Sequence, residues 1–328
     1  MTMRRRDFLA GGSGVIATWP RPAASQAHKR NPKIAVLWHA ASAEEEHPYY
    51  GELLRGFREL GYGEGSLTFE HRFPDEKPAL FTSMAAELVS LNPDVLVAVG
   101  GAAPYAKRAT ATIPTVFMYV PDPVGSKLVE SIRRPGWNAT GLTNFSVELS
   151  AKRLEYLKEI SPSLSRVAVL INPTVKISEL YVDQSKAAGS KLGLTTQAFE
   201  VRSPGELVAT FDAIVKAGMQ AIVVNAESLF YQIRDAIAQL ALQRRLLTCV
   251  WVREVLEAGC LVSYGADQLS IARRVAVYVD RILKGERPAD MPVEQPARFQ
   301  LLLNLKTAKA LSLTMPSHLL SSAEELIE

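Results

Sequence analysis

From Lys33 onward, short apolar runs alternate with segments of helical periodicity, and this alternation restricts the fold more than any other feature of the sequence. The run Lys33–Trp38 (KIAVLW) is almost wholly apolar, as strands covered on both faces are. The following segment, Tyr49–Leu60, has apolar residues three or four positions apart, which is the spacing of a helix packed on a sheet. Strand and helix in regular succession predict a parallel sheet with right-handed crossovers, and hence an α/β fold.

The same succession occurs twice along the chain. In the first unit, strands are expected at Lys33–Trp38, Ser66–Phe73, Asp94–Val99 and Thr115–Tyr119. In the second unit, after a helix over Leu149–Ile160, they are expected at Val167–Ile171, Thr195–Val201, Ala221–Asn225 and Leu247–Trp251. A length of 328 residues also exceeds what one core usually serves. We therefore expect two doubly wound parallel-sheet lobes.

The connections between the two units indicate a hinge rather than a flexible linker. The break falls at Gly141–Ser146, without a long disordered segment. The tail contains a helix at Ser270–Lys284, an extended run at Val293–Leu303 and a final helix at Lys306–Leu311. A tail of this length can cross between the lobes more than once, so we expect a multi-segment hinge. The expected lobes are discontinuous: residues 33–144 plus about 267–292, and residues 145–266 plus about 293–328.

The N-terminal residues have the pattern of an export signal. Arg5 and Arg6 are followed by Asp-Phe-Leu, which fits the twin-arginine motif, and a weakly apolar stretch follows over Ala10–Trp19. That stretch is too short to span a bilayer. We expect residues 1–27 to be a signal peptide cleaved near Ala27, which would place the protein in the periplasm. Because no Cys lies near the cleavage site, no lipid anchor is expected; a disordered basic tail is the alternative interpretation.

Composition argues against nucleic acid as a partner but does not decide whether the two cysteines form a disulfide. The formal net charge is +3, and Lys and Arg do not cluster on one element as they do in nucleic-acid-binding proteins. The two cysteines, Cys249 and Cys260, both lie in apolar surroundings. A disulfide between neighbouring strands is one interpretation, and two buried free thiols is the favoured one.

Candidate ligand-binding residues follow the predicted strands. In an open parallel sheet, ligands bind beyond the carboxyl ends of the strands. In the first unit, the residues at these positions are His39, Ser42, Gly100, Gly101, Ala102 and Asp122. In the second unit, they are Asn172, Asn225, Glu227, Trp251 and Tyr264.

Most of these residues have a structural explanation beside the functional one. Gly100 and Gly101 let a backbone approach an anion, and equally suit a tight turn. Asp122, between two prolines, suits either a ligand amine or the start of a helix or turn. Trp251 and Tyr264 could stack on a flat ligand, although aromatic residues at strand ends are more often part of the core.

The sequence gives little support to catalysis, a metal or a cofactor. His39 and His47 flank Glu44–Glu46, but the spacing fits no compact zinc motif, and a charged flexible loop is the expected explanation. A nucleophile elbow, a phosphate-binding Walker loop and a dinucleotide fingerprint are all missing from the sequence. We therefore expect a binding protein without enzymatic activity, with no cofactor and no metal.

Several strings of the sequence match a known family in combination. They include Asp122–Gly125 (DPVG), Arg134–Gly141 (RPGWNATG) and Pro292–Pro296 (PVEQP). With these, the chain resembles the ABC transporter substrate-binding proteins of the group that contains tryptophan- and tyrosine-binding lipoproteins, over nearly all of residues 33–328. The resemblance implies a periplasmic-binding-protein type I-like fold whose lobes are joined by three crossings and close on a ligand by a hinge motion.

The resemblance also implies which residues bind and with which partners. By position in the motifs, it adds Asn144, Phe145 and Asp267 to the candidate ligand-binding residues above. The chain departs from the family at Gly100–Pro104, where relatives often have Gly-Thr-Pro, so a hydroxyl suited to a carboxylate is absent.

The expected function is capture of a small organic solute, an amino acid or aromatic carboxylate being candidates. A monomer would deliver this solute to an ABC permease and ATPase complex at the inner membrane. The alternatives are a periplasmic sensor that presents its ligand to a receptor and, less favoured, an exported enzyme.

Overall fold

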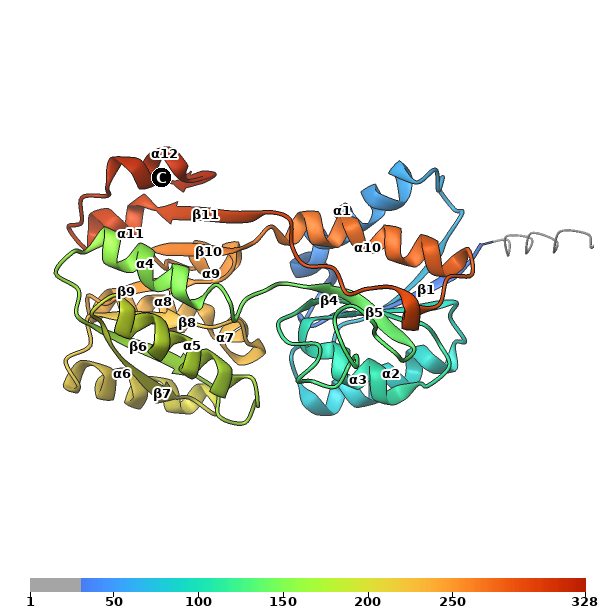
Figure 1. Ribbon diagram of the computed structural model, residues 1–328, viewed down its shortest axis with the longest axis horizontal. Helices are drawn as coiled ribbons and strands as arrows, with labels where there is room; N and C mark the ends of the chain where they lie inside the picture. The colour runs from blue at the N-terminus through green and yellow to red at the C-terminus, as the bar shows by residue number, and fades with distance from the viewer. Residues whose placement is uncertain (1–30) are drawn as a thin grey trace, which may run out of the picture.

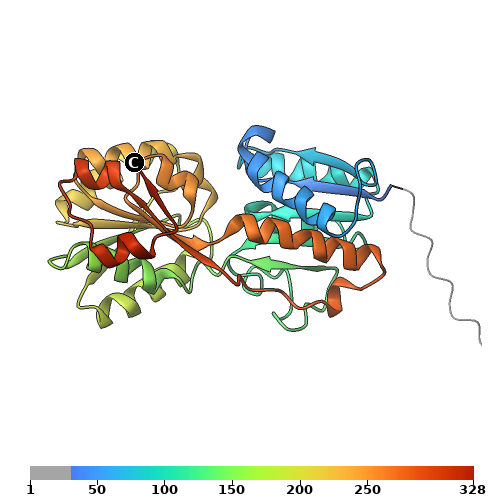
Figure 2. The same ribbon diagram turned by 90° about the horizontal axis from the view of Figure 1, so that it is seen from above.

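The computed structural model describes residues 31–328, so the twin-arginine segment at residues 1–27 lies outside the described residues. The described chain forms two α/β lobes side by side, joined by a few extended segments (Figure 1). Turning the molecule by 90° shows the same two bodies with narrow connections between them (Figure 2). No helix in residues 31–328 is long and apolar enough to cross a membrane.

The first lobe is built on a five-stranded parallel sheet with the order β2-β1-β3-β4-β5. Its strands are β1 (Lys33–Leu37), β2 (Thr68–Arg72), β3 (Val95–Val99), β4 (Thr115–Val120) and β5 (Ala139–Thr143). Helices α2 (Pro78–Ser90) and α3 (Ala103–Ala109) lie on one face, and α1 (Ala43–Glu59) and α10 (Gln268–Leu283) on the other (Figure 1). Both faces are therefore covered, which explains why the central strands are buried throughout and almost wholly apolar.

The second lobe contains a seven-stranded sheet with the order β12-β11-β10-β9-β8-β6-β7. Its strands are β6 (Arg166–Ile171), β7 (Thr195–Glu200), β8 (Ala221–Val224), β9 (Leu247–Val250), β10 (Val262–Ala266), β11 (Phe299–Asn304) and β12 (Glu325–Ile327). Its helices are α4 (Ser150–Ile160), α5 (Ser178–Lys191), α6 (Leu207–Lys216), α7 (Ser228–Gln232), α8 (Arg234–Gln243), α9 (Arg253–Glu257), α11 (Leu305–Ala310) and α12 (Ser317–Ser322). Only the β10–β11 pair is antiparallel among the strand pairs described. Two doubly wound lobes confirm the predicted fold class.

Three segments of the described chain cross between the lobes. The first joins β5 to α4, the second joins β10 to α10, and the third leads into β11. The third crossing begins after Glu294, because Val293 donates to the Ile132 carbonyl and Glu294 bridges to Leu142 in the first lobe. The tail therefore returns to the second sheet slightly later than the expected boundary at about 293.

A buried arginine binds two of these crossings together. The Arg153 side chain on α4 is 0% exposed and donates to the carbonyls of Ser146 and Tyr264, each at 3.0 Å. It also donates to the Ser146 hydroxyl at 3.0 Å. Since Ser146 lies on the first crossing and Tyr264 on β10 just before the second, one guanidinium holds both segments in register.

The strand β5 was not expected, because its sequence (ATGLT) is short and lies at the predicted break. The structure pairs it with β4 and explains its glycine. A side chain at Gly141 would place its Cβ 2.0 Å from the Phe117 carbonyl oxygen. The glycine therefore allows two backbones to approach closely, a role that local periodicity does not reveal. The elements α12 and β12 were likewise not expected.

Cys249 and Cys260 are buried free thiols, which confirms the favoured interpretation. Burial raises the pKa of each thiol to about 12, so neither is a thiolate at neutral pH.

Candidate functional site

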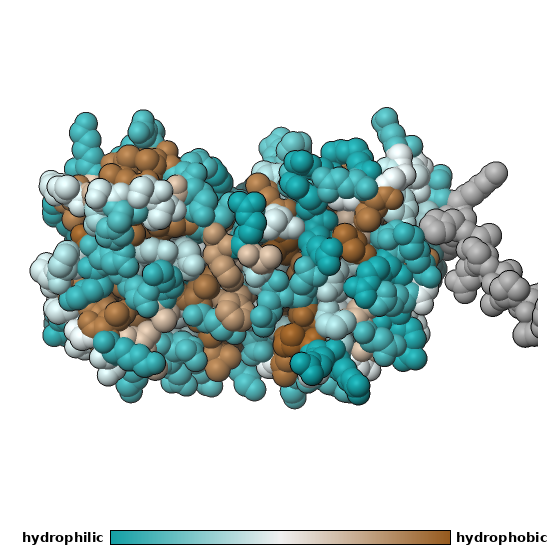
Figure 3. All heavy atoms as spheres, turned by 45° about the horizontal axis from the view of Figure 1, so that its top comes forward, coloured by the Kyte–Doolittle hydropathy of each residue, from teal (hydrophilic) through white to brown (hydrophobic). Residues whose placement is uncertain are grey.

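A cavity of about 1140 Å³ lies between the lobes and is lined by residues of both. It occupies the region beyond the carboxyl ends of the parallel strands, as expected for this sheet type. Where the lobes meet, apolar side chains reach the surface among hydrophilic ones (Figure 3). The cavity lining includes these residues expected from the sequence: His39, Gly100, Gly101, Asp122, Asn144, Asn172, Glu227 and Trp251.

Six expected residues lie outside this lining, and two of them start helices. They are Ser42, Ala102, Phe145, Asn225, Tyr264 and Asp267. The Ser42 hydroxyl accepts a hydrogen bond from the Glu45 amide at 3.3 Å and caps α1. The Asp267 carboxylate accepts one from the Ser270 amide at 3.1 Å and caps α10. Both side chains thus satisfy free amides of a first helical turn.

The other four pack within the lobes or at the crossings. Phe145 and Tyr264 each lie 6.3 Å, between ring centroids, from Phe299, so they form an aromatic cluster beside the crossings. Asn225 donates to the Leu170 carbonyl at 3.3 Å and is buried at the end of β8. Ala102 is completely buried in the core of the first lobe.

Asp122 lines the cavity, but its carboxylate is committed to a turn. Its Oδ1 accepts a hydrogen bond from the Gly125 amide at 2.8 Å, and the Ser126 hydroxyl donates to its carbonyl at 2.6 Å. A Cβ at Gly125 would lie 1.9 Å from the Asp122 Oδ2 atom. The Asp-Pro-Val-Gly string therefore encodes a tight turn at the edge of the cavity.

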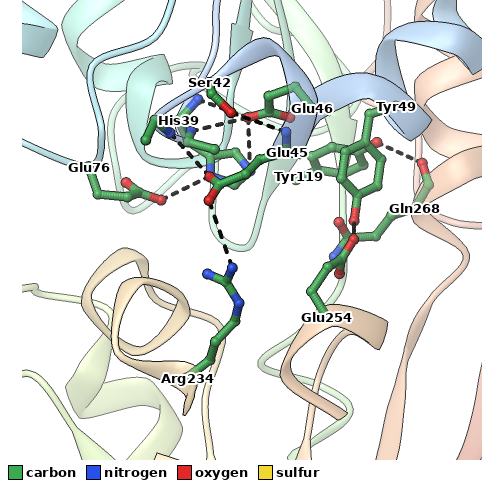
Figure 4. Close-up of polar contacts among 12 residues, drawn as sticks. His39, Ser42, Glu45, Glu46, Tyr49, Glu76, Tyr119, Arg234, Glu254 and Gln268 are labelled. Atoms are coloured by element: carbon green, nitrogen blue, oxygen red, sulfur yellow. Dashed lines mark hydrogen bonds and ion pairs between the residues drawn. The ribbon is translucent and has the colours of Figure 1, made fainter. Parts of the chain in front are cut away.

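His39 lies at the centre of a buried polar cluster (Figure 4). Its Nδ1 is 2.9 Å from Glu76 Oε1, and its Nε2 is 3.6 Å from Glu46 Oε1. Glu46 Oε1 also accepts a hydrogen bond from the Ala40 amide at 3.1 Å. The expected charged flexible loop is wrong, because Glu44–Glu46 forms the first turn of α1, where carboxylates favour the helix dipole. Glu46 is only 1% exposed.

The surrounding carboxylates keep His39 charged. Burial lowers the pKa of this imidazole, but the charges of Glu46 and Glu76 and the hydrogen bond to Glu76 outweigh burial and raise the pKa to about 9. At neutral pH the cluster therefore contains an imidazolium shared by two carboxylates.

We predict that the protein without ligand loses stability as the pH rises through about 9. The His39 pKa lies above its ordinary value of 6.5, so its contribution is complete below pH 6.5 and disappears as the folded protein deprotonates. The loss should be about 3 kcal/mol between pH 6 and pH 9.5, from the size of the shift. Urea unfolding across this range measures it. His39→Gln should be less stable at pH 6 and should show a flatter pH profile; an unchanged profile would contradict the prediction.

Glu76 lines the cavity although it was not among the residues expected from the sequence. Asp75 and Glu76 follow the edge strand β2, and both have φ of 53°. Their amides donate to the carbonyls of Ala40 and His39, at 3.1 and 2.9 Å, which holds this turn against the end of β1. Applying the strand-end rule to the expected strand Ser66–Phe73 would have found Glu76. Left-handed backbone at two successive non-glycine residues is strain of the kind that positions side chains at functional sites.

Tyr119 is the second cavity residue with an unusual backbone. It has φ of 62° within β4, where the pairing with β5 shifts register. Its hydroxyl donates to the Gln268 carbonyl at 2.7 Å, and its ring lies 5.7 Å from that of Tyr49 (Figure 4). The sequence identified the position as a strand end but did not predict this orientation.

Direct contacts join the lobes around the cavity. The Tyr49 hydroxyl of α1 donates to Glu254 on α9, and Arg234 of α8 pairs with Glu45 at 3.8 Å (Figure 4). The His39 and Tyr231 rings meet edge to face at 5.2 Å. The described conformation therefore has the two lobes in contact.

In the second lobe, Asn172 and Glu227 form a polar wall. Asn172 donates to Glu227 Oε1 at 3.2 Å, and the Leu229 amide donates to Glu227 Oε2 at 2.9 Å. Burial raises the pKa of Glu227 to about 7, and these hydrogen bonds only partly offset it. The described residues contain no group of three or more His, Cys, Asp or Glu side chains placed to hold a metal ion.

Apart from its polar groups, the cavity has an aromatic wall. Phe81 and Tyr105 stack with their centroids 4.9 Å apart, and Arg108 lies over the Tyr105 ring at 4.5 Å. With Trp251 on the opposite lobe, these rings offer flat apolar surface to a ligand.

Two lobes around a cavity of this kind define a periplasmic-binding-protein type I-like protein. The family model described as ABC transporter substrate binding protein matches residues 34–327. The chain therefore belongs to the ABC transporter substrate-binding protein family, as the resemblance implied. This is a family of solute-binding proteins, not of enzymes.

Similar structures and sequences agree with this assignment. An ABC domain from Streptococcus pneumonia in complex with L-Trp is 25% identical, with a TM-score of 0.84, and the match covers 90% of this chain and 100% of that one. A conserved domain protein from Vibrio cholerae is 28% identical, with a TM-score of 0.83 and coverage of 90% and 99%. A tyrosine-binding protein from Clostridioides difficile is 22% identical over 82% of this chain and 79% of its own length.

Proposed function

We propose that the protein is the solute-binding component of an ABC importer. Exported by its twin-arginine signal, cleaved near Ala27 and not lipid-anchored, it would capture a small organic solute in the periplasm. As a monomer, it would then deliver the solute to a permease and ATPase complex at the inner membrane.

The observation that carries the proposal is a large cavity that both lobes line. A ligand in this position touches both lobes at once, so its binding free energy favours the closed arrangement over the open one. The hinge of three crossings permits such a motion. Two similar proteins, a domain in complex with L-Trp and a tyrosine-binding protein, support a small organic ligand for this chain too.

A thermal-shift screen of the purified protein against amino acids, amines, aromatic acids and sugars tests the proposal. A solute at about 100 times its dissociation constant adds about 2.7 kcal/mol to the free energy of unfolding. The same solute should reduce the radius of gyration in solution scattering, because the lobes close on it. A hit that stabilises the protein and is chemically converted would contradict the proposal.

Gly101→Val tests whether ligand binding requires the two lobes to close. A Cβ at Gly101 would lie 2.7 Å from the Ser228 hydroxyl on the opposite lobe, so a valine should hold the lobes apart and weaken binding of every hit. Gly63→Val is the control, since a Cβ there meets nothing within 4 Å.

A further inference from the structure

We infer that the cavity binds a protonated amine between Glu76 of the first lobe and Glu227 of the second, so that the transported solute is an organic cation. This inference rests on the proposed function and names the chemical class of its ligand. It differs from the expectation of a carboxylate ligand, because Glu76 and Glu227, which line the cavity, carry acidic side chains.

The first observation is a set of buried carboxylate oxygens without partners. The Glu76 side chain is 6% exposed and lines the cavity, and its Oε2 has no hydrogen-bond partner among the described residues. The Oε2 atoms of Glu46 and Glu254 are also buried and unpartnered within residues 31–328. A buried carboxylate oxygen without a donor is costly, so such an atom in a cavity indicates a ligand that supplies one.

The second observation places carboxylates of both lobes at one point of the cavity. A Cβ built on Gly101 would be 3.5 Å from Glu76 Oε2 and 2.7 Å from the Ser228 hydroxyl. Glu227, the residue before Ser228, caps α7 and lines the same cavity. Glu76 and Glu227 therefore approach each other across the interlobe gap, and the charge of Glu76 contributes to the raised pKa of Glu227.

The cationic side chains around the cavity do not neutralise the carboxylates of Glu76 and Glu227. The imidazolium of His39 is the buried cation beside Glu76, and Glu46 and Glu76 already share that cation. The basic residues of the cavity lining are Lys77, Arg108, Lys176 and Arg202, and all four are exposed. Lys77 pairs with Asp75, and Arg202 pairs with Glu200. They line the solvent-exposed part of the cavity, not the buried carboxylates.

Closure then depends on the charge of the ligand. Bringing the lobes together moves two carboxylates toward each other in a region that excludes water, which is unfavourable unless Glu227 takes up a proton or a cation lies between them. An ammonium group has three donors and a positive charge, so it satisfies the free oxygen of Glu76 and reduces the repulsion by Glu227.

Isothermal titration calorimetry with paired probes tests the inference at pH 7.5. The aromatic pair is tryptamine and indole-3-propionate, and the aliphatic pair is putrescine and succinate. At least one amine should bind, and its carboxylate counterpart should not. Glu227→Gln should weaken the amine by at least about 30-fold, as expected when one partner of a buried charge pair is lost. Glutamine keeps an acceptor for Asn172 or the Leu229 amide, so the lobe should stay folded.

Glu179→Gln is the matched control, because Glu179 lines the same cavity but is exposed. It should leave the affinity for the amine within about twofold. Binding of a carboxylate probe without any amine, binding of neither amine, or an amine affinity unchanged in Glu227→Gln would each overturn the inference. If the amines do not bind but another solute binds and closes the lobes, the amine site is wrong and the proposed function is still supported. If no solute of any class binds, the proposed function itself fails.

Discussion

Arg153→Ala is expected to destabilise the protein by about 3–5 kcal/mol, which is the largest effect we predict for a side chain outside the cavity. The wild-type guanidinium is fully buried and donates to the Ser146 carbonyl, the Ser146 hydroxyl and the Tyr264 carbonyl. Alanine would leave these acceptors without donors in a region that water does not reach, together with a cavity the size of the lost side chain. Urea unfolding followed by circular dichroism measures the change.

Two comparisons separate the role of Arg153 from a general effect on α4. Lys152→Ala, at the neighbouring and partly exposed position, should cost less than about 1 kcal/mol, because its ion pair with Glu155 lies at the surface. Arg153→Lys retains the charge but not the planar set of donors, so it should recover only part of the loss. Equal stability of Arg153→Ala and Lys152→Ala would show that the guanidinium does not hold the crossings.

The Arg153 substitution also bears on function. Ser146 and Tyr264 lie at the first two crossings, so loss of their common donor should widen the range of lobe orientations in solution scattering. A ligand that must touch both lobes would then bind more weakly even though no cavity residue has changed.

Gly56→Ala is expected to destabilise the first lobe by about 3 kcal/mol. Gly56 lies in α1 where this helix packs on α10, and a Cβ there would be 2.3 Å from the Arg273 carbonyl oxygen and 2.8 Å from the Ala276 Cβ. Backbone atoms cannot move aside as a flexible side chain can, so the helices must separate. Thermal and urea unfolding measure the loss of stability.

Gly51→Ala is the matched control in the same helix. A Cβ at Gly51 meets nothing within 4 Å, so alanine should stabilise the protein by up to about 1 kcal/mol through its better helix propensity. The two glycine substitutions should therefore have opposite signs. If both stabilised the protein, the α1–α10 contact would not be as close as the structure has it.

Gly56→Ala should also affect ligand binding, because α1 contributes Glu46 and Tyr49 to the region of the cavity. Displacing the helix would move the carboxylate beside His39 and the hydroxyl that reaches Glu254. A loss of affinity that accompanies the loss of stability would link helix packing to the site.

The sequence by itself determined the two α/β lobes and the family. Continuous apolar runs such as Val95–Val99 identify strands covered on both faces, because only buried parallel strands need apolar residues at every position. Motif strings identified the family and added Asn144 to the cavity lining, and the positions after the predicted strands supplied seven further lining residues. These inferences succeed because periodicity and sheet topology are properties of successive residues along the chain.

Tertiary structure decided which of the polar residues face the cavity and which hold the fold. Nothing local distinguishes Asp267, which caps a helix, from Glu76, which presents a free oxygen to the cavity. Similarly, Arg153 shares a helical face with Leu157 and Ile160, but its sequence does not reveal which groups of the crossings it binds when buried. The reason is physical: burial and hydrogen-bond partners are set by segments far apart in the chain, as Gly141 and Phe117, or Arg153 and Tyr264, illustrate. Residue type gives the chemistry that a side chain can perform, and only packing between distant segments decides where it performs it.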